Sequence, residues 1–466
     1  MKDRAPIEGL PSASAPSPEE LAAEIEWLRE QESRSGLSRS FAFLRKGGPG
    51  YLQSALTLGG GTAATMLFAG AAFGYGLLWV APVSMVLGVI MMSAVAHQTL
   101  STGLRPFEAM RVYAGPVFAW GFAGGAVISS IIWHFAQYSL GAAVISDMGQ
   151  AAGVEISHGL GGAIVLAVAV VWAFAYGKSS KALRYFETSL KVLVWGIVGC
   201  FGLVVLKTGI HDPVALINGY IPFQFPESDS GVQASTVVVG GLAAAVGANM
   251  LFLYPYSLLA RGWGRDHRRL ANFDLIAGMF LPYMLATSLM VIATANAFHY
   301  GDLEFSGTRL SPVEAAQALA TAVGEGFGRW IFNLGILGMA VSSIILQMVC
   351  CGFVATEVLG WRFGSKRYRL ACLLPAPGVL GAVLWTDVAL WVAVPTTLLC
   401  GFMLPLAYIG FIKLQRNHDY LGDDVPGGGK GAAWLGGMVL ATLTLTVFLI
   451  WYAITKGPDF FGRLFG

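Results

Sequence analysis

After Pro49 the chain alternates between long apolar stretches and short polar connections. The apolar stretches are about 20 residues or longer, the length at which an α-helix crosses the hydrocarbon core of a bilayer. The pattern predicts eleven spans, at residues 49–70, 75–96, 116–145, 159–176, 185–206, 233–260, 273–298, 330–359, 370–384, 388–412 and 434–454. We therefore expect an all-α integral membrane protein.

Composition agrees with this prediction. Of the 466 residues 55% are hydrophobic and 12% are charged, against about 25% charged in an ordinary soluble domain. The net charge of +2 gives no electrostatic support for a nucleic-acid partner. No phosphate loop, cofactor fingerprint or nucleophile with a neighbouring base is evident in the sequence. We expect neither an enzyme nor a bound cofactor, and the expected partners are the lipid bilayer and a transported solute.

The chain divides into a polar tail, a core and an appended span. Residues 1–48 form the tail, in which a short acidic amphipathic helix begins at Pro18; it is either a docking helix or a solvated segment. Residues 49–412 hold ten spans, which form one repeat at 49–206 and an inverted repeat at 233–412. Residues 413–466 hold a loop and the eleventh span.

Basic residues gather in the even-numbered loops. The sixth loop carries Arg261, Arg265, Arg268 and Arg269, whereas the third and fifth loops carry mainly acids. Lys and Arg in short loops mark the cytoplasmic side. We expect a protein of the plasma (inner) membrane with a cytoplasmic N-terminus and an external C-terminus.

Two spans are interrupted at the depth where a transmembrane helix should be most regular. Span 1 contains Gly59-Gly60-Gly61-Thr62, and span 6, its counterpart in the second repeat, contains Gly247-Ala248-Asn249. Backbone opened at mid-membrane is tolerated where it lines a cavity, and secondary transporters bind substrate there. Close helix packing is the alternative explanation of each glycine. The two breaks predict a transported-substrate site.

Several segments together resemble the NRAMP family of proton-coupled divalent metal transporters. The resemblance rests on Gly48–Leu52, Gly59–Thr62, Ala69–Tyr75, Ala315–Leu319 and Leu404-Pro405. It covers residues 48–412 and implies the leucine-transporter-type architecture of five plus five inverted spans, with eleven spans in this chain and spans 1 and 6 broken.

The functional residues of that family match this chain poorly. The Asp-Pro-Gly-Asn break of span 1 corresponds to Gly59, Gly60, Gly61 and Thr62, and the Met-Pro-His motif of span 6 corresponds to Asn249, Met250 and Leu251. The resemblance implies further site positions, with Thr397 in span 10 on the binding site and His134, Gln137 and Tyr256 on the proton pathway. This chain therefore resembles a divergent member of the family without the usual metal ligands.

The lost carboxylate leaves three functions open, because a mid-membrane cation without a countercharge is unfavourable by several kcal/mol. The first is transport of a hard or hydrated divalent cation bound by Thr62, Asn249 and backbone carbonyls. The second is transport of a small organic solute such as an amino acid, whose carboxylate would bind bare glycine N–H groups. The third is a sensor that transports nothing. His134 is either a proton relay or a neutral histidine bonded to a neighbouring helix.

Overall fold

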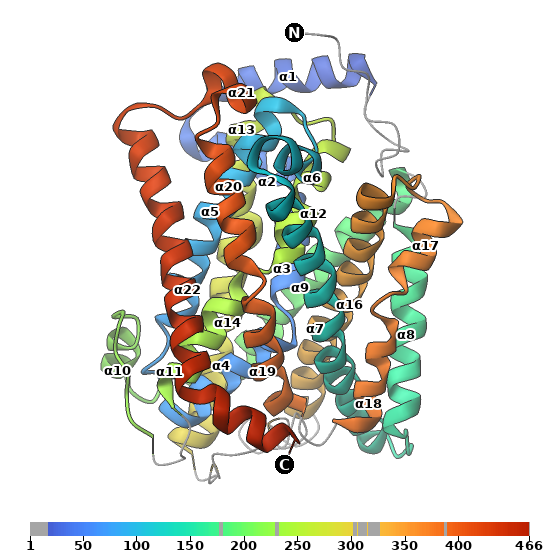
Figure 1. Ribbon diagram of the computed structural model, residues 1–466. Coiled ribbons are helices and arrows are strands. Elements are labelled where there is room, and N and C mark those ends of the chain that lie inside the picture. Colours follow the sequence, from blue (N-terminus) through green and yellow to red (C-terminus); the bar gives the residue numbers. More distant parts are fainter. Residues whose placement is uncertain are drawn as a thin grey trace.

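Helices account for every regular element that the structure describes. The computed structural model describes residues 17–176, 180–228, 233–301, 305, 315, 327–385 and 389–465. Residues 316–319 of the family resemblance lie outside these ranges. The helices form an elongated bundle with α1 (Pro18–Glu32) at one end and the last turns of α22 (Gly428–Phe465) at the other (Figure 1).

Helices of membrane-crossing length and apolarity follow the predicted order closely. Nine helices in the described part of the chain satisfy both criteria, and the bent pair α3 and α4 makes a tenth crossing. The residues predicted as the first repeat hold α3 (Pro49–Thr57), α4 (Gly60–Phe73), α5 (Val80–Thr102), α7 (Pro116–Ala151), α8 (His158–Ala175) and α9 (Ser180–Thr208), and the division into repeats stays a prediction. The residues predicted as the second repeat hold α11 (Ala234–Ala245), α12 (Ala248–Ala260), the run from α13 (Arg268–Asp274) through α14 (Leu281–Thr294), α16 (Phe327–Leu359), α19 (Ala389–Gly401) and α20 (Leu404–Gln415).

The predicted ninth span is not a continuous helix. Its residues form α17 (Lys366–Cys372), a 3-10 turn at Ala376–Leu380 and α18 (Gly381–Leu384). Pro375 and Pro377 interrupt the segment, because proline lacks the N–H that a helix interior needs. Figure 1 places α17 and α18 near opposite ends of the bundle, so this chain segment still traverses it.

Both predicted breaks are present. Helices α3 and α4 meet at 58° across Leu58 and Gly59. Between α11 and α12, Val246 and Gly247 adopt extended backbone with φ of −141° and −99°. These broken spans are the innermost ones, since 94% of the apolar window of α11 and α12 is buried, against 28% for α8, α9 and α22.

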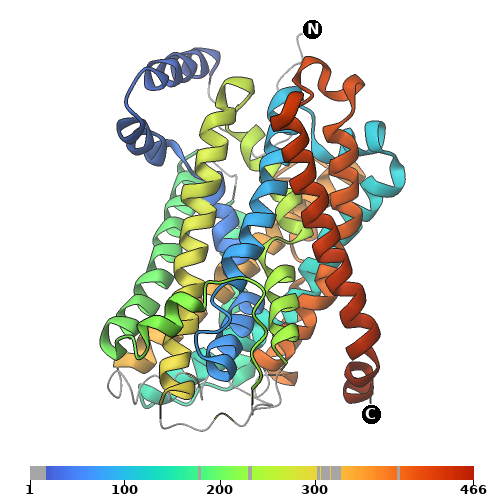
Figure 2. The same ribbon diagram turned by 90° about the vertical axis from the view of Figure 1, so that its left-hand side faces the viewer.

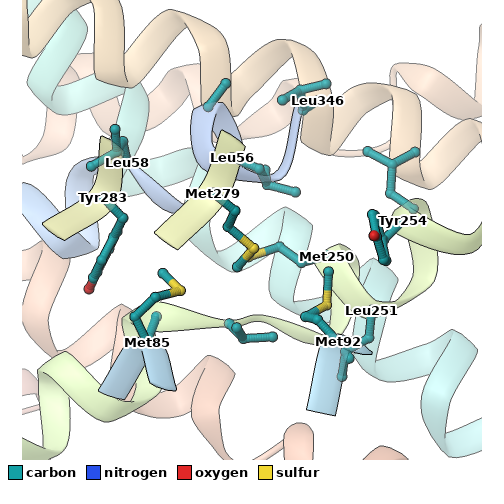
Figure 3. Packing of buried hydrophobic residues seen from close by; sticks show 14 of the residues in the cluster. Leu56, Leu58, Met85, Met92, Met250, Leu251, Tyr254, Met279, Tyr283 and Leu346 are labelled. Carbon is teal, nitrogen blue, oxygen red and sulfur yellow. The ribbon is translucent and has the colours of Figure 1, made fainter. Parts of the chain in front are cut away.

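The core around the breaks is rich in methionine. Met85, Met250 and Met279 are almost fully buried and gather beside Leu56 and Tyr283 (Figure 3). Methionine is unbranched and fills irregular space well. Methionine side chains can therefore fill the irregular space around the two helix breaks.

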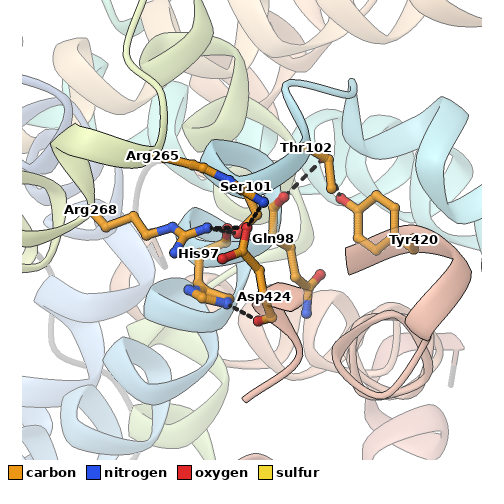
Figure 4. A network of polar contacts seen from close by, with 8 residues as sticks. All are labelled: His97, Gln98, Ser101, Thr102, Arg265, Arg268, Tyr420 and Asp424. Atoms are coloured by element: carbon orange, nitrogen blue, oxygen red, sulfur yellow. Dashed lines mark hydrogen bonds and ion pairs between the residues drawn. The ribbon is translucent and has the colours of Figure 1, made fainter. Parts of the chain in front are cut away.

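One end of the bundle carries α1, α13, α17 and α21 (His418–Leu421) (Figure 1), and we call it the basic end. Asp424 pairs there with Arg265 and, at 2.7 Å, with Arg268, and its carbonyl oxygen lies 2.9 Å from His97 Nε2 (Figure 4). These contacts join α5 to the loop before α22. The cytoplasmic placement of this end remains a prediction.

Candidate functional site: a cavity between the two helix breaks

A small cavity lies where the breaks of spans 1 and 6 approach α7, α16 and α19. Its volume is about 20 Å³, room for a metal ion or for one or two water molecules. Organic ligands usually occupy pockets of about 300 Å³ or more, so a cavity of this volume is too small for one. The lining residues are Leu56, Thr57, Gly59, Gly61, Thr62, Trp133, Gln137, Ala244, Asn249, Met250, Gln347 and Thr397.

Three threonine hydroxyls line the cavity, and each donates its hydrogen to a backbone carbonyl. Thr57 Oγ1 donates to the carbonyl of Ala245 at 2.8 Å, which links the two breaks directly. Thr62 Oγ1 donates to the carbonyl of Thr57 at 2.6 Å, and Thr397 Oγ1 donates to that of Ala393 at 2.7 Å. A hydroxyl whose hydrogen is engaged still has lone pairs to offer. The cavity therefore contains oxygen atoms oriented as acceptors.

The break in span 1 has few free backbone groups left. The N–H of Gly60 donates to Gln137 Oε1 at 2.9 Å, and the N–H of Gly59 donates to the carbonyl of Thr57 at 2.8 Å. Ser342 and Ser343 of α16 donate to the carbonyls of Ala55 and Leu56 at 2.9 and 3.1 Å. Side chains of neighbouring helices thus replace the missing helical bonds, as burial requires.

The break in span 6 places an amide at the cavity. Asn249 Oδ1 accepts from the N–H of Met250 at 2.9 Å, whereas its buried Nδ2 has no hydrogen-bond partner. The Met250 sulfur accepts from the N–H of Gly247 at 3.4 Å. Gln347 of α16 is a second buried amide of the lining, and its side chain interacts with His134. An unsatisfied polar atom such as Asn249 Nδ2 indicates a place for an ion or water.

The glycines of both breaks are also required for packing. A Cβ at Gly61 would lie 2.0 Å from Thr397 Oγ1, and one at Gly60 would lie 2.3 Å from Leu140 Cδ1. At Gly59 it would lie 2.6 Å from both Gln137 Nε2 and Ser343 Oγ, and at Gly247 it would lie 2.7 Å from Trp133. A substitution at any of them would disturb the packing, whatever the cavity binds.

The three predicted proton-pathway residues are not equally placed. Gln137 lines the cavity, and His134, one turn earlier on α7, is completely buried with Nδ1 2.8 Å from the carbonyl of Ser130. That bond makes Nδ1 the protonated nitrogen of a neutral ring. Tyr256 is not a lining residue and stacks on Phe252 with ring centroids 5.3 Å apart. Of the three, Gln137 alone is among the described lining residues, and His134 lies one helical turn from it.

Among the residues that the structure describes, no carboxylate lines the cavity. In the described part of the chain, no group of three or more His, Cys, Asp or Glu residues is arranged to hold a metal. Asp147 is buried elsewhere, where it accepts from Asn333 at 2.6 Å and pairs with Arg329. Any cation in the cavity would therefore meet neutral ligands.

Most of the sequence-predicted site residues are brought together, although their roles in binding stay predictions. Gly59, Gly61, Thr62, Asn249, Met250 and Thr397 line the cavity, and Gly60 and Gly247 adjoin it. Sequence reasoning missed Thr57 and Trp133. Thr57 precedes the glycine run by two residues, and that position in a broken span is the signal that could have found it.

Known proteins resemble this chain over most of its length. The family model described as natural resistance-associated macrophage protein-like (Nramp) matches residues 50–452. The divalent metal cation transporter MntH of Chromohalobacter salexigens is 23% identical over 92% of this chain and 96% of its own length. The protein of the same name from Deinococcus radiodurans is 24% identical over 91% and 93%.

Solved structures agree on the fold. A manganese transporter of Eremococcus coleocola, in complex with an aromatic bis-isothiourea compound, superposes with a TM-score of 0.69 at 17% identity, covering 91% of this chain and 90% of its own. The nucleobase-cation-symport-1 family transporter Mhp1, in a closed conformation, gives 0.56 at 15% identity over 87% and 92%. At these identities the likeness concerns the fold alone.

Proposed function

Because this chain belongs to the Nramp family, we propose that it carries a hard divalent metal cation across the membrane, bound by neutral oxygen ligands. The relatives that share its length are named as divalent metal cation transporters. They are transporters and not enzymes, and the proposed partners of this chain are a metal cation, with proton coupling, and the bilayer.

The observation that carries the proposal is the set of oriented threonine hydroxyls around the cavity. Thr57, Thr62 and Thr397 each have the hydrogen bound to a carbonyl, so their oxygens present the negative end of the dipole, although the Thr397 oxygen already accepts from Trp133 Nε1 at 3.2 Å. Asn249 and Gln347 add amide oxygens to the lining. Oxygen ligands suit hard cations such as Mg²⁺ and Ca²⁺.

A soft transition metal is a poorer candidate cargo. Met250 supplies the one sulfur of the lining, and this sulfur already accepts from the N–H of Gly247. The described lining offers no thiolate, imidazole or carboxylate to add affinity. We therefore expect Mg²⁺ to be preferred over Mn²⁺.

The organic-solute alternative has less support. The N–H of Gly60, which would bind a substrate carboxylate, already donates to Gln137. The cavity of about 20 Å³ is also far smaller than an organic ligand needs. Intolerance of side chains at Gly60 and Gly61 would not discriminate, because packing alone forbids them.

The test is divalent-ion uptake by the purified protein in liposomes, measured for Mg²⁺ and Mn²⁺. Thr62→Val removes one cavity oxygen while the Thr57 carbonyl keeps its bond to Gly59 N–H. We expect uptake at limiting ion concentration to fall about tenfold, as the loss of one ligand implies. Thr65→Val is the matched control, since Thr65 lies on the same helix outside the lining and donates to Gly61 O. Absence of uptake by the unmodified protein would overturn the proposal.

Asn249→Asp sharpens the test by adding charge with little change of shape. The carboxylate keeps an acceptor for the Met250 N–H, and the amide hydrogens that are lost have no partner. Gly59→Asp adds the same charge but forces a Cβ against Gln137 and Ser343. Uptake that appears only in Asn249→Asp would show a working carrier whose natural cargo is not a divalent metal. No uptake by any variant would favour the sensor.

We propose His134 as the proton-coupling group, with Gln137 linking it to the cavity. The buried His134 ring interacts with the side chain of Gln347, which also lines the cavity. In liposomes, His134→Gln should abolish metal-driven proton movement and leave some metal uptake. Unchanged proton movement would assign His134 to helix packing.

A further inference from the structure

Helix α2 (Gly36–Lys46) has an apolar face that no described part of the chain covers. Leu37, Phe41 and Leu44 are 78%, 70% and 39% exposed. They lie at spacings of four and three residues and therefore on one side of the helix. The apolar face is thus continuous and unpartnered.

The opposite side of α2 packs onto the protein. The Phe43 ring, which is 4% exposed, contacts Phe273 at 5.6 Å and Trp27 of α1 at 6.4 Å between centroids. Phe41 precedes Phe43 by two residues, about 200° around the helix. Helix α1 therefore covers one side of α2, and the apolar face points away from it.

The position of α2 matches the level of a membrane surface. Its C-cap, Gly47, accepts a 2.6 Å hydrogen bond from Lys191 Nζ of α9, and the next residue of α9, Val192, is 68% exposed on the outside of the bundle. In Figure 2, α1 and α2 (dark blue) extend beyond the side of the bundle at the basic end. Helix α2 thus lies beside the apolar belt of the bundle, where that belt ends.

Basic residues also lie within α2 and just before it. Arg34, Arg39 and Arg45 have no ion-pair partner among the described residues. No acidic residue occurs between Ser33 and Lys46. Helices that combine an apolar face with Arg and Lys lie in the interface plane and attract anionic lipids.

We propose that α2 is an in-plane membrane anchor that binds anionic lipid headgroups at the basic end. Leu37, Phe41 and Leu44 enter the boundary between headgroups and acyl chains, and Arg45, next to Leu44, and Arg34, just before the helix, contact the headgroup phosphates. This anchor is independent of the transported cargo.

The full-length protein tests this anchor in lipid nanodiscs through a label at position 41. Phe41→Cys is made in a Cys200→Ser background, because the other four cysteines are buried, and is coupled to an environment-sensitive fluorophore. Discs contain phosphatidylcholine alone or with phosphatidylglycerol, each with nitroxide-bearing lipid as quencher. We expect a blue-shifted, quenched label, more strongly so in the anionic discs and less so in high salt.

Two matched variants complete the design. Glu30→Cys, labelled on the exposed side of α1, should remain unquenched in both discs. Arg34→Gln and Arg45→Gln together should remove most of the difference between anionic and neutral discs. A label at position 41 that stays unquenched in both discs would overturn the anchor. Equal quenching in both discs, unaffected by the arginine changes, would overturn lipid recognition by charge.

Discussion

Span 1 is held at its start by charges and at its break by hydroxyl groups. At the start, Asp274 accepts from the N–H groups of Gly48 and Gly50 at 2.9 and 2.6 Å, and Arg261 and Lys191 donate to the carbonyls of Lys46 and Gly47. At the break, donors such as Thr57 and Ser343 are neutral. Charged side chains therefore bind the backbone of span 1 at the end of the bundle, and neutral dipoles bind it at the break.

This difference has a physical reason. An ion pair at the basic end has counter-ions and headgroups nearby, whereas an ion at mid-bundle would be several kcal/mol less favourable than in water. Hydroxyl-to-carbonyl bonds satisfy opened backbone without that penalty. A cation arriving in the cavity is then the largest charge there.

The largest effect should follow from breaking the charged anchor. Asp274→Ala leaves the buried N–H groups of Gly48 and Gly50 unpaired, whereas Arg261 keeps its 2.6 Å ion pair with Glu187, so the expected loss of stability is about 2–4 kcal/mol. Thermal unfolding of the detergent-purified protein measures it. Asp423→Ala, an exposed carboxylate at the same end, is the control and should change stability by less than about 0.5 kcal/mol. Equal melting of both variants would refute the charged anchor.

The neutral hydrogen bonds at the break of span 1 should contribute less to stability than the contacts of Asp274. Thr57→Val keeps the shape of the side chain but withdraws the hydroxyl hydrogen from the carbonyls of Ala244 and Ala245, at an expected loss of about 1–3 kcal/mol. Thr65→Val, whose hydroxyl only supplements a bond within its own helix, should lose less. If Thr57→Val and Thr65→Val unfolded at the same temperature, the hydroxyl of Thr57 would not be the contact that links the two breaks.

The same contrast shows what the sequence could predict. The two breaks were readable because glycine in a membrane-length apolar run is a local signal. The ninth span was expected as a plain helix, and Pro375 and Pro377 divide it into short pieces. Thr62 and Asn249 were found through their place in the breaks, and both line the cavity.

Contacts between residues far apart in the chain could not be predicted from the sequence. Asp274 accepts hydrogen bonds from backbone groups more than 220 positions earlier in the chain. The hydroxyl orientation at Thr57 likewise depends on carbonyls 187 and 188 positions away. Composition and spacing do not encode such pairings, which come from the packing of the two repeats against each other.

A smaller effect concerns pH at Asp424. Burial alone would raise the pKa of this carboxyl, but the ion pairs with Arg268 and Arg265 outweigh burial and lower the pKa below its ordinary value of about 3.9. The unfolded chain then takes up the proton first, so the contribution to stability is complete above that ordinary value and disappears as pH falls through the folded pKa. Melting curves between neutral and acid pH should converge for the unmodified protein and Asp424→Asn. A constant gap would contradict this linkage.

The smallest effect is expected at Arg29, whose guanidinium lies 3.9 Å from Asp266. Both side chains are largely exposed, at 74% and 48%, and an ion pair in water is screened and entropically unfavourable to hold. Arg29→Ala should change stability by less than about 0.5 kcal/mol and should not loosen α1, because Leu28 and Trp27 pack onto the protein beside it. Limited proteolysis of residues 17–46 together with thermal unfolding measures both. Faster cleavage of Arg29→Ala would mean that an exposed ion pair holds α1 in place. Exposed charges would then contribute to stability at the basic end as the buried contacts of Asp274 do.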